Sequence, residues 1–131
     1  MLEFFVGGIP RPQGSKRGFL RNGRIILVEA SKQLPEWRSE IVLAAREAIH
    51  DQNWVVADGP CRVEAVFFIP KGKTVKREFP TTTPDADKLA RGLLDAMTTA
   101  KVWLDDAQCV DLIVLKRYSD APGVSVNVTV L

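Results

Sequence analysis

The sequence is poor in the residue types that build zinc sites and disulfide frameworks. It contains two cysteines, Cys61 and Cys109, and a single histidine, His50. A zinc site with nitrogen and sulfur ligands needs more such side chains, so any bound metal must be one that prefers oxygen ligands. Each cysteine lies within a β-type run, so we expect two buried, reduced thiols, which is typical of a cytoplasmic protein.

Long apolar runs are also absent. No stretch approaches the roughly 20 apolar residues of a membrane helix, and the N-terminal MLEFFVGGIP has no basic residues before its apolar stretch, unlike a signal peptide. The sequence has no repeat and no glycine-rich phosphate loop. With 131 residues, 46% of them hydrophobic and 26% charged, we expect a single domain over residues 1–131 that binds neither a membrane nor an organic cofactor.

Apolar periodicity predicts short strands and two helices. Strands are predicted at 2–9, near 18–21, at 24–29, 61–69, 109–118 and 123–130. Asn22-Gly23 predicts a type I′ hairpin turn, and the last two strands are expected to form an antiparallel pair. Helical spacing predicts one helix with Pro35 in its first turn, ending near residue 50, and a second over 87–100. The order β-β-β-α-β-α-β-β predicts an α/β (α+β-like) domain, with a mixed, mostly antiparallel sheet covered mainly on one face.

Two acidic pairs flank the second predicted helix, Asp85 with Asp87 and Asp105 with Asp106. In a regular helix, side chains at i and i+2 point about 200° apart. Asp85 and Asp87 can therefore share a ligand only if Asp85 is extended and the helix begins near Asp87. Because Thr83 precedes a proline, an extended backbone before the helix is favoured.

The four aspartates allow a structural and a functional interpretation. They can be helix caps and turn residues, and Asp87, Arg91 and Asp95 can form a salt-bridged solvent face. Alternatively, three carboxylates without histidine favour Mg²⁺ or Mn²⁺, the ions used in phosphodiester hydrolysis. For Asp106 to meet Asp85, the following strand must run back past the helix start, or the loop must fold beneath it.

Basic residues gather in two runs near turn-rich segments, Arg11, Lys16 and Arg17 in the first and Lys71, Lys73, Lys76 and Arg77 in the second. Such runs either solubilise exposed loops or bind a polyanion held near the acidic pairs. Phe19 and Phe79 lie beside these runs. A core position is the more typical place for a phenylalanine, and stacking on bases is the alternative.

The run Pro84-Asp85-x-Asp87-x-Leu89, then Leu94-Asp95-Ala96-Met97 and Trp103-Leu104-Asp105-Asp106-Ala107-Gln108, resembles the RusA family of Holliday junction resolvases. The resemblance implies a homodimeric, Mg²⁺-dependent endonuclease that resolves four-way DNA junctions by paired symmetric nicks in recombination and repair. It implies metal ligation by Asp85, Asp87 and Asp106, with Asp105 in a supporting role. It also implies a bacterial, phage or prophage origin and phosphate contacts by the two basic runs.

Two positions depart from the family pattern. Lys88 stands where the family has an asparagine, and Arg91 stands where it has a functional lysine. Arginine can stabilise charge at the scissile phosphate, but it does not give up a proton. Lys88 can supply the ammonium group if its side chain curls toward the carboxylates. The alternative is a structure-specific junction-binding protein with weak or lost catalysis.

Overall fold

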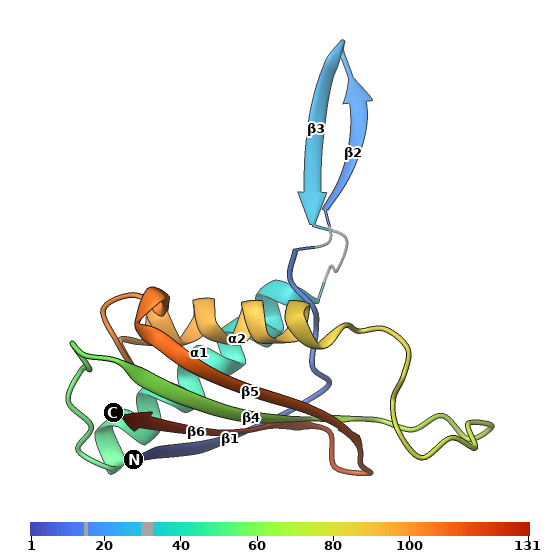
Figure 1. Cartoon of the computed structure of the whole chain (residues 1–131). Helices are drawn as coiled ribbons and strands as arrows, with labels where there is room; N and C mark the ends of the chain where they lie inside the picture. The colour runs from blue at the N-terminus through green and yellow to red at the C-terminus, as the bar shows by residue number, and fades with distance from the viewer. Residues whose placement is uncertain (15, 30–32) are drawn as a thin grey trace.

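The computed structural model of the chain describes residues 1–14, 16–29 and 33–131, with 16–21 and 25–29 described as backbone alone. Its elements in chain order are β1 (Leu2–Gly7), β2 (Lys16–Arg21), β3 (Arg24–Glu29), α1 (Leu34–Asp51), β4 (Cys61–Ile69), α2 (Ala86–Ala100), the 3-10 turn η1 (Asp106–Gln108), β5 (Cys109–Tyr118) and β6 (Gly123–Val130). The predicted order of strands and helices is confirmed (Figure 1).

The main sheet has four strands in the order β1-β6-β4-β5. β6 pairs antiparallel with β1 and β4, whereas β5 pairs parallel with β4. The prediction that 109–118 and 123–130 pair with each other is therefore wrong, because β4 lies between them. Alternation along a strand reveals its buried face but not its neighbour, and α2 serves as the crossover that a parallel pair requires. As a result β5 lies at an edge of the sheet.

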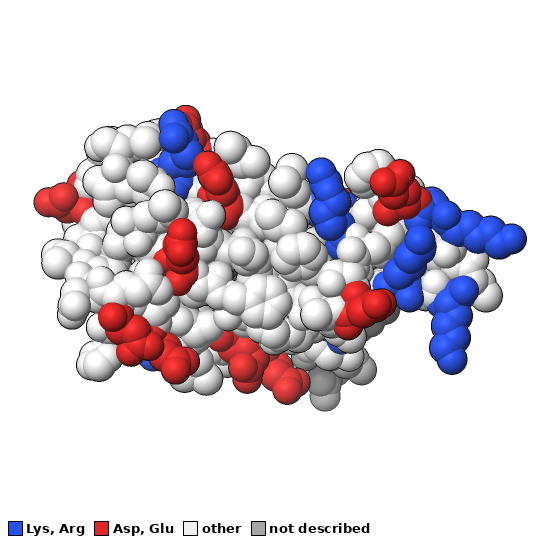
Figure 2. All heavy atoms as spheres, turned by 90° about the horizontal axis from the view of Figure 1, so that it is seen from below, with Lys and Arg blue, Asp and Glu red and all other residues white. Residues whose placement is uncertain are grey.

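Both helices cover one face of the sheet, and the core lies between them and that face (Figure 1). Alternate side chains of β4 and β6, such as Phe67 and Val126, point toward the helices and are fully buried. Leu89, Leu93 and Met97 form the matching stripe of α2, and burial of each such side chain contributes roughly 1.5–3 kcal/mol. Figure 2 views the opposite face of the sheet, on the side away from α1 and α2.

β2 and β3 form a separate two-stranded sheet that projects from the body of the protein (Figure 1). Their turn has positive φ at both central residues, 53° at Asn22 and 75° at Gly23. The predicted type I′ turn is therefore confirmed. Lys16 and Arg17 lie at the start of β2, so the first basic run extends into this projecting hairpin.

The two cysteines are partners in the parallel register of β4 and β5, and both are free thiols. Cys61 is buried as predicted, whereas Cys109 is half-buried. Burial raises the pKa of both thiols, which keeps them protonated and unreactive. Across the described residues, no helix combines the length and the apolar character needed to cross a membrane.

Candidate active site

The first acidic pair lies where α2 begins. Asp85 is the N-cap residue and has an extended backbone, with φ −73° and ψ 142°. Asp87 follows in the first turn, so the predicted change from extended to helical backbone between the two is confirmed. The Asp85 side chain makes no capping hydrogen bond, and both carboxylates are exposed. Both are therefore accessible to a ligand beside the partial positive charge of the helix N-terminus.

Two lysines lie beside Asp85. Lys88 Nζ is 3.5 Å from Asp85 Oδ2, so its side chain does turn toward the acidic pair. Lys116, on β5, donates hydrogen bonds to the carbonyl oxygens of Thr82 at 2.9 Å and Pro84 at 2.8 Å. Lys116 therefore holds the backbone that leads into Asp85 and adds a second ammonium group there. Sequence reasoning missed this residue, because its contacts are more than thirty positions away along the chain.

Arg91 lies one turn further along α2, beneath the segment that leads to the hairpin. The Arg91 guanidinium packs closely against Gly14, since a Cβ at position 14 would lie 3.1 Å from Arg91 Nη1. Gly14 also has a φ of +108°, which favours glycine. In the described part of the chain, no ion pair joins Arg91 to Asp87 or Asp95. The alternative in which Asp87, Arg91 and Asp95 form a salt-bridged solvent face is therefore wrong.

The segment before the hairpin is anchored along α2 by Gln13. Its backbone N–H donates to the Lys88 carbonyl oxygen at 3.0 Å, and its side-chain amide donates to the Asp95 carboxylate. Gln13 also packs over Gly92, where a Cβ would lie 3.5 Å from the Gln13 Cβ. Arg11, on the same segment, is half-buried. These contacts place the first basic run above the helix that carries the acidic residues.

The second acidic pair is held in place by Gln108. Its Oε1 accepts hydrogen bonds from the backbone N–H groups of Leu104 and Asp105, and its Nε2 donates to the carbonyl oxygens of Ala57 and Gly59, all at 2.9 Å. Asp105 completes a capping box at the start of η1. The interpretation of Asp105 as a cap and turn residue is therefore confirmed, and Asp106 emerges from a rigid turn with its carboxylate free of capping.

Asp106 lies among other carboxylates. Burial raises its pKa, and Asp105 and Asp95 raise it further through hydrogen bonding and charge. A cation bound here would relieve that repulsion. Asp95 was interpreted from the sequence as a surface residue, and only the fold reveals its proximity to Asp106.

One chain does not bring the two acidic pairs together. Asp95, the neighbour of Asp106, is ten residues beyond Asp85 on α2, a rise of about 15 Å along the helix axis. β5 does run back to the start of α2, but it carries Lys116 there and leaves Asp106 at its far end. Within residues 1–14, 16–29 and 33–131, no group of three or more histidine, cysteine or acidic side chains could hold a metal ion.

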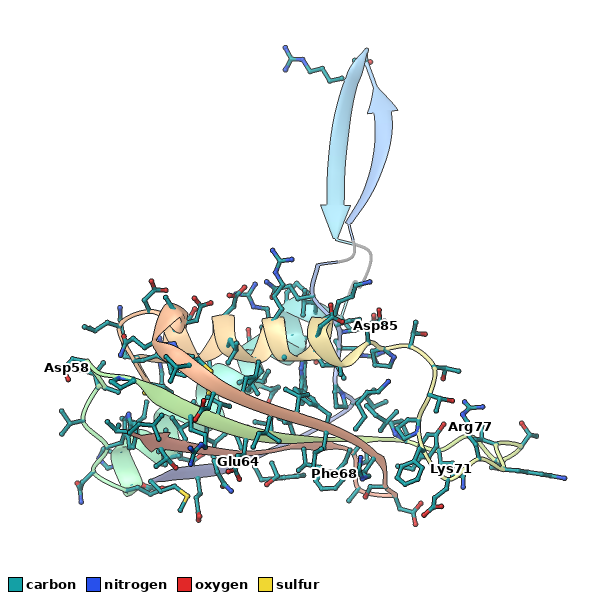
Figure 3. The ribbon with its side chains drawn as sticks, viewed as in Figure 1. Asp58, Glu64, Phe68, Lys71, Arg77 and Asp85 are labelled. Atoms are coloured by element: carbon teal, nitrogen blue, oxygen red, sulfur yellow. The ribbon has the colours of Figure 1, made fainter. Side chains whose placement is uncertain are left out.

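The second basic run lies at the same end of the molecule as Asp85 (Figure 3), and Figure 2 shows basic side chains gathered at that end. Lys71 and Arg77 lie over the ring of Tyr118, at 5.5 and 6.0 Å from its centroid. Arg117 lies 5.3 Å from the ring centroid of Phe79. Phe79 is 49% exposed, so its expected core position is wrong. Lys73 and Lys76 are exposed between these contacts.

A family model described as Endodeoxyribonuclease RusA matches residues 8–129, nearly the whole chain. The protein is thus a nuclease of the class that cuts within DNA. More particularly, the chain belongs to the RusA family of Holliday junction endonucleases, which act in recombination. The chain is also 32% identical to the uncharacterized protein YqaN of Bacillus subtilis (strain 168) over 139 residues, which cover 97% of this chain and 94% of that protein.

Proposed function

We propose that the protein is a Mg²⁺-dependent, structure-specific endonuclease that resolves four-way DNA junctions by paired symmetric nicks. The observation that carries the proposal is the start of α2, where Asp85 and Asp87 are exposed beside Lys88 and Lys116. The basic loop lies at the same end of the molecule (Figure 3). A phosphodiester requires such a combination, because carboxylates hold the metal while cations attract the polyanion.

The available donors suit a hard cation. Asp85, Asp87 and Asp106 offer only oxygen ligands, which Mg²⁺ prefers and Mn²⁺ accepts. Burial, and after it the neighbouring Asp105 and Asp95, raises the pKa of Asp106, and a bound cation would stabilise the charged form of this carboxylate. When bound, the ion would activate a water molecule and offset charge on the phosphorus. Asp105 would support Asp106 by fixing the η1 turn.

The basic side chains near Asp85 would stabilise charge that develops on the phosphate. Lys88 and Lys116 place ammonium groups beside the acidic pair, and Arg91 adds a guanidinium one turn along the helix. Fixed positive charges are most effective where the transition state gains negative charge. Lys88 and Lys116 would thereby take the role of the family lysine that Arg91 replaces.

Contacts with DNA would come mainly from the two basic runs. Lys71, Lys73, Lys76 and Arg77 line the loop near Asp85, and Arg11 lies on the segment that leads to the hairpin carrying Lys16 and Arg17. Loops of this kind bind phosphates without reading sequence. Selection of a four-way junction would then depend on its shape. Two symmetric nicks also require two sites related by a two-fold axis, so we propose a homodimer.

Cleavage of a labelled synthetic four-way junction with Mg²⁺ tests the proposal. The wild type should cut two opposing strands symmetrically, whereas Asp85→Asn should lose about 100-fold or more in rate while still binding the junction. Glu47→Gln, the same chemical change at an exposed position of α1, should cut normally. Binding without cutting by every protein, with Mg²⁺ or Mn²⁺, would favour the junction-binding alternative instead.

A further inference from the structure

A small pocket, the proline pocket, adjoins the start of α2. Its described lining comes from residues 9–12, 69–70 and 83–84. Pro84 belongs to this lining and immediately precedes Asp85, so a ligand in the pocket lies next to the exposed carboxylates. The volume is about 340 Å³, near the lower limit for a small-molecule site. A pocket of this size suits one flat ring system better than a peptide or a base pair.

The walls of the proline pocket are mainly apolar. They include four prolines, at positions 10, 12, 70 and 84, and the two isoleucines Ile9 and Ile69. Ile9 is 46% exposed, so part of this apolar surface faces solvent. Enzymes that take a base out of the DNA stack hold it between apolar or aromatic side chains. The walls therefore offer a surface on which the face of an unpaired nucleobase can pack.

Arg11 supplies the charge in the described lining of the proline pocket. Its side chain is half-buried, and no carboxylate pairs with it in the part of the chain that the structure describes. A guanidinium carries five N–H donors in a fixed fork and has no acceptor. The pocket thus combines apolar walls with hydrogen-bond donors, the two features by which an extruded base is held and read.

Backbone hydrogen bonds hold the walls of the proline pocket in place. The Gly8 N–H donates to the Pro122 carbonyl at 3.1 Å, and the Gln13 N–H donates to the Lys88 carbonyl at 3.0 Å. Residues 9–12 are therefore fixed at both ends as they pass the start of α2 (Figure 1). The bonds from Lys116 hold the wall at residues 83–84. A pocket formed in advance binds its ligand at a lower entropic cost.

We propose that the proline pocket binds one unpaired nucleobase, from a nucleotide adjacent to the scissile phosphate, and that Arg11 donates hydrogen bonds to the edge of this base. The inference rests on the proposed function, because it requires that phosphate to lie at Asp85 and Asp87. It also adds a property to that function. The basic runs would bind phosphates without reading sequence, whereas the pocket would make cutting depend on a base.

The fluorescence of 2-aminopurine, which is quenched by stacking between bases, tests whether a base enters the pocket. The analogue is placed singly at successive positions across a synthetic four-way junction, and the complex is formed in Ca²⁺ so that the strands stay intact. Binding should raise the fluorescence severalfold at one position adjacent to the mapped cut, because the described lining has no aromatic ring. No rise at either nucleotide flanking the cut would overturn the proposal.

A pair of variants separates entry into the pocket from general distortion of the junction. Ile9→Ser removes part of one apolar wall without adding charge, and it should abolish most of the fluorescence rise. Val55→Ser is the matched control, since Val55 is 80% exposed between α1 and β4, and it should leave the rise unchanged. A full rise in an Ile9→Ser protein that is folded and saturated with junction would overturn the proposal.

Four junctions that differ only in the base at that position test Arg11. Single-turnover cutting by the wild type in Mg²⁺ should differ about tenfold between the best and the worst base, as expected for a bidentate arginine contact. Arg11→Met should bring the four rates together, and Arg11→Lys should keep the charge but lose the preference. Arg77→Met, in the basic loop, should slow all four rates equally. An Arg11→Met protein with unaltered preference would overturn the role of Arg11.

The fluorescence measurements also separate this inference from the proposed nuclease. They require only that the protein binds the junction. If the wild type cuts no junction with Mg²⁺ or Mn²⁺, the nuclease proposal fails, while a fluorescence rise that Ile9→Ser abolishes still identifies the proline pocket as a base-binding site. If the wild type cuts but no flanking base becomes fluorescent, the pocket proposal fails and the nuclease stands.

Discussion

At the scale of single residues, the aspartates of the candidate site lie in different electrostatic surroundings. Asp85 is exposed and has Lys88 as a neighbour, whereas Asp106 is half-buried among Asp95 and Asp105. Removing the charge of Asp85 thus takes away one member of an ion pair. Removing the charge of Asp106 relieves repulsion among carboxylates. The two substitutions should therefore differ in their effect on stability, although the proposed function predicts that both abolish cleavage.

We predict that Asp106→Asn stabilises the metal-free protein at pH 7. Because burial and neighbouring charge raise the pKa of Asp106, the folded state holds its proton more tightly than the unfolded chain. The contribution of this group to stability is therefore lost as pH rises through the folded pKa. Thermal melting should show a higher Tm for the variant at pH 7, with the difference vanishing below about pH 3.8, where both states are protonated.

The same melts provide the controls for Asp106. Glu47→Gln should shift the Tm little at either pH, since surface substitutions usually change stability by less than about 0.5 kcal/mol. Mg²⁺ should raise the Tm of the wild type more than that of Asp106→Asn, because the variant lacks one of the proposed ligands. An Asp106→Asn protein that melts lower than the wild type at pH 7 would contradict the prediction.

Lys116 gives a second prediction at this scale. Its ammonium group makes two hydrogen bonds to the backbone before Asp85, so Lys116→Met should lower the free energy of unfolding by about 1–2 kcal/mol. Junction cleavage should fall roughly tenfold, as expected when one stabilising positive charge is removed. Lys116→Arg should recover part of both losses.

Lys73→Met is the control for Lys116 in urea denaturation, since Lys73 is an exposed loop lysine and its replacement should leave stability unchanged. A decrease in cleavage for Lys116→Met without any recovery in Lys116→Arg would mean that the positive charge itself is not what the site requires.

At the scale of elements, the sequence was most informative where local geometry decides the structure. Asn22-Gly23 specifies its turn through positive φ, and Asp85, directly after Pro84, has the extended backbone expected before α2. The helices and strands follow from apolar spacing. Gln108 shows where such reasoning stops. The sequence shows a glutamine after two aspartates, but its bonds to Ala57 and Gly59 join segments about fifty residues apart.

Gln108 should be essential for the η1 turn. Gln108→Ala removes four hydrogen bonds and should lower the free energy of unfolding, measured by urea denaturation, by about 2–3 kcal/mol, because two partly buried carbonyl groups lose their donor. Gln108→Glu keeps an acceptor for the Leu104 and Asp105 N–H groups but cannot donate to Ala57 and Gly59. We expect its stability to lie at or below that of the alanine variant, since its charge would face two carbonyl oxygens.

Asn53→Ala is a poor comparison for Gln108, because Asn53 has a positive φ of 53° that alanine disfavours. Gln52→Ala is the better one. Gln52 also bonds only backbone, accepting from the Glu3 N–H and donating to the Glu3 carbonyl, but at the exposed edge strand β1. Gln52→Ala should therefore lower the free energy of unfolding by less than Gln108→Ala does. Equal losses for both would show that the η1 turn does not depend on Gln108.

At the scale of the whole molecule, the arrangement of the sheet decides what the candidate site can be. The sequence predicts the β5 and β6 boundaries but not that β4 separates them, since pairing depends on contacts between distant segments. That order places Lys116 beside Pro84 and leaves Asp106 at the other end of β5. The acidic residues could therefore be identified from the sequence, whereas their separation within one chain could not.

The charge distribution of the molecule gives the last prediction. Lys73 and Lys76 lie exposed on the basic loop near Asp85, and each phosphate that a lysine neutralises releases counterions when DNA binds. Replacing both with glutamine should flatten the slope of log affinity against log salt by about 0.9 for each phosphate that is no longer neutralised, or nearly two in total.

Fluorescence anisotropy with a labelled, uncut junction in Ca²⁺ measures this slope. Arg46→Gln, at an exposed position of α1, should leave the slope unchanged. An unaltered slope in the double variant would assign the loop to solubility rather than to DNA, and would direct the search for phosphate-binding residues to the β2–β3 hairpin.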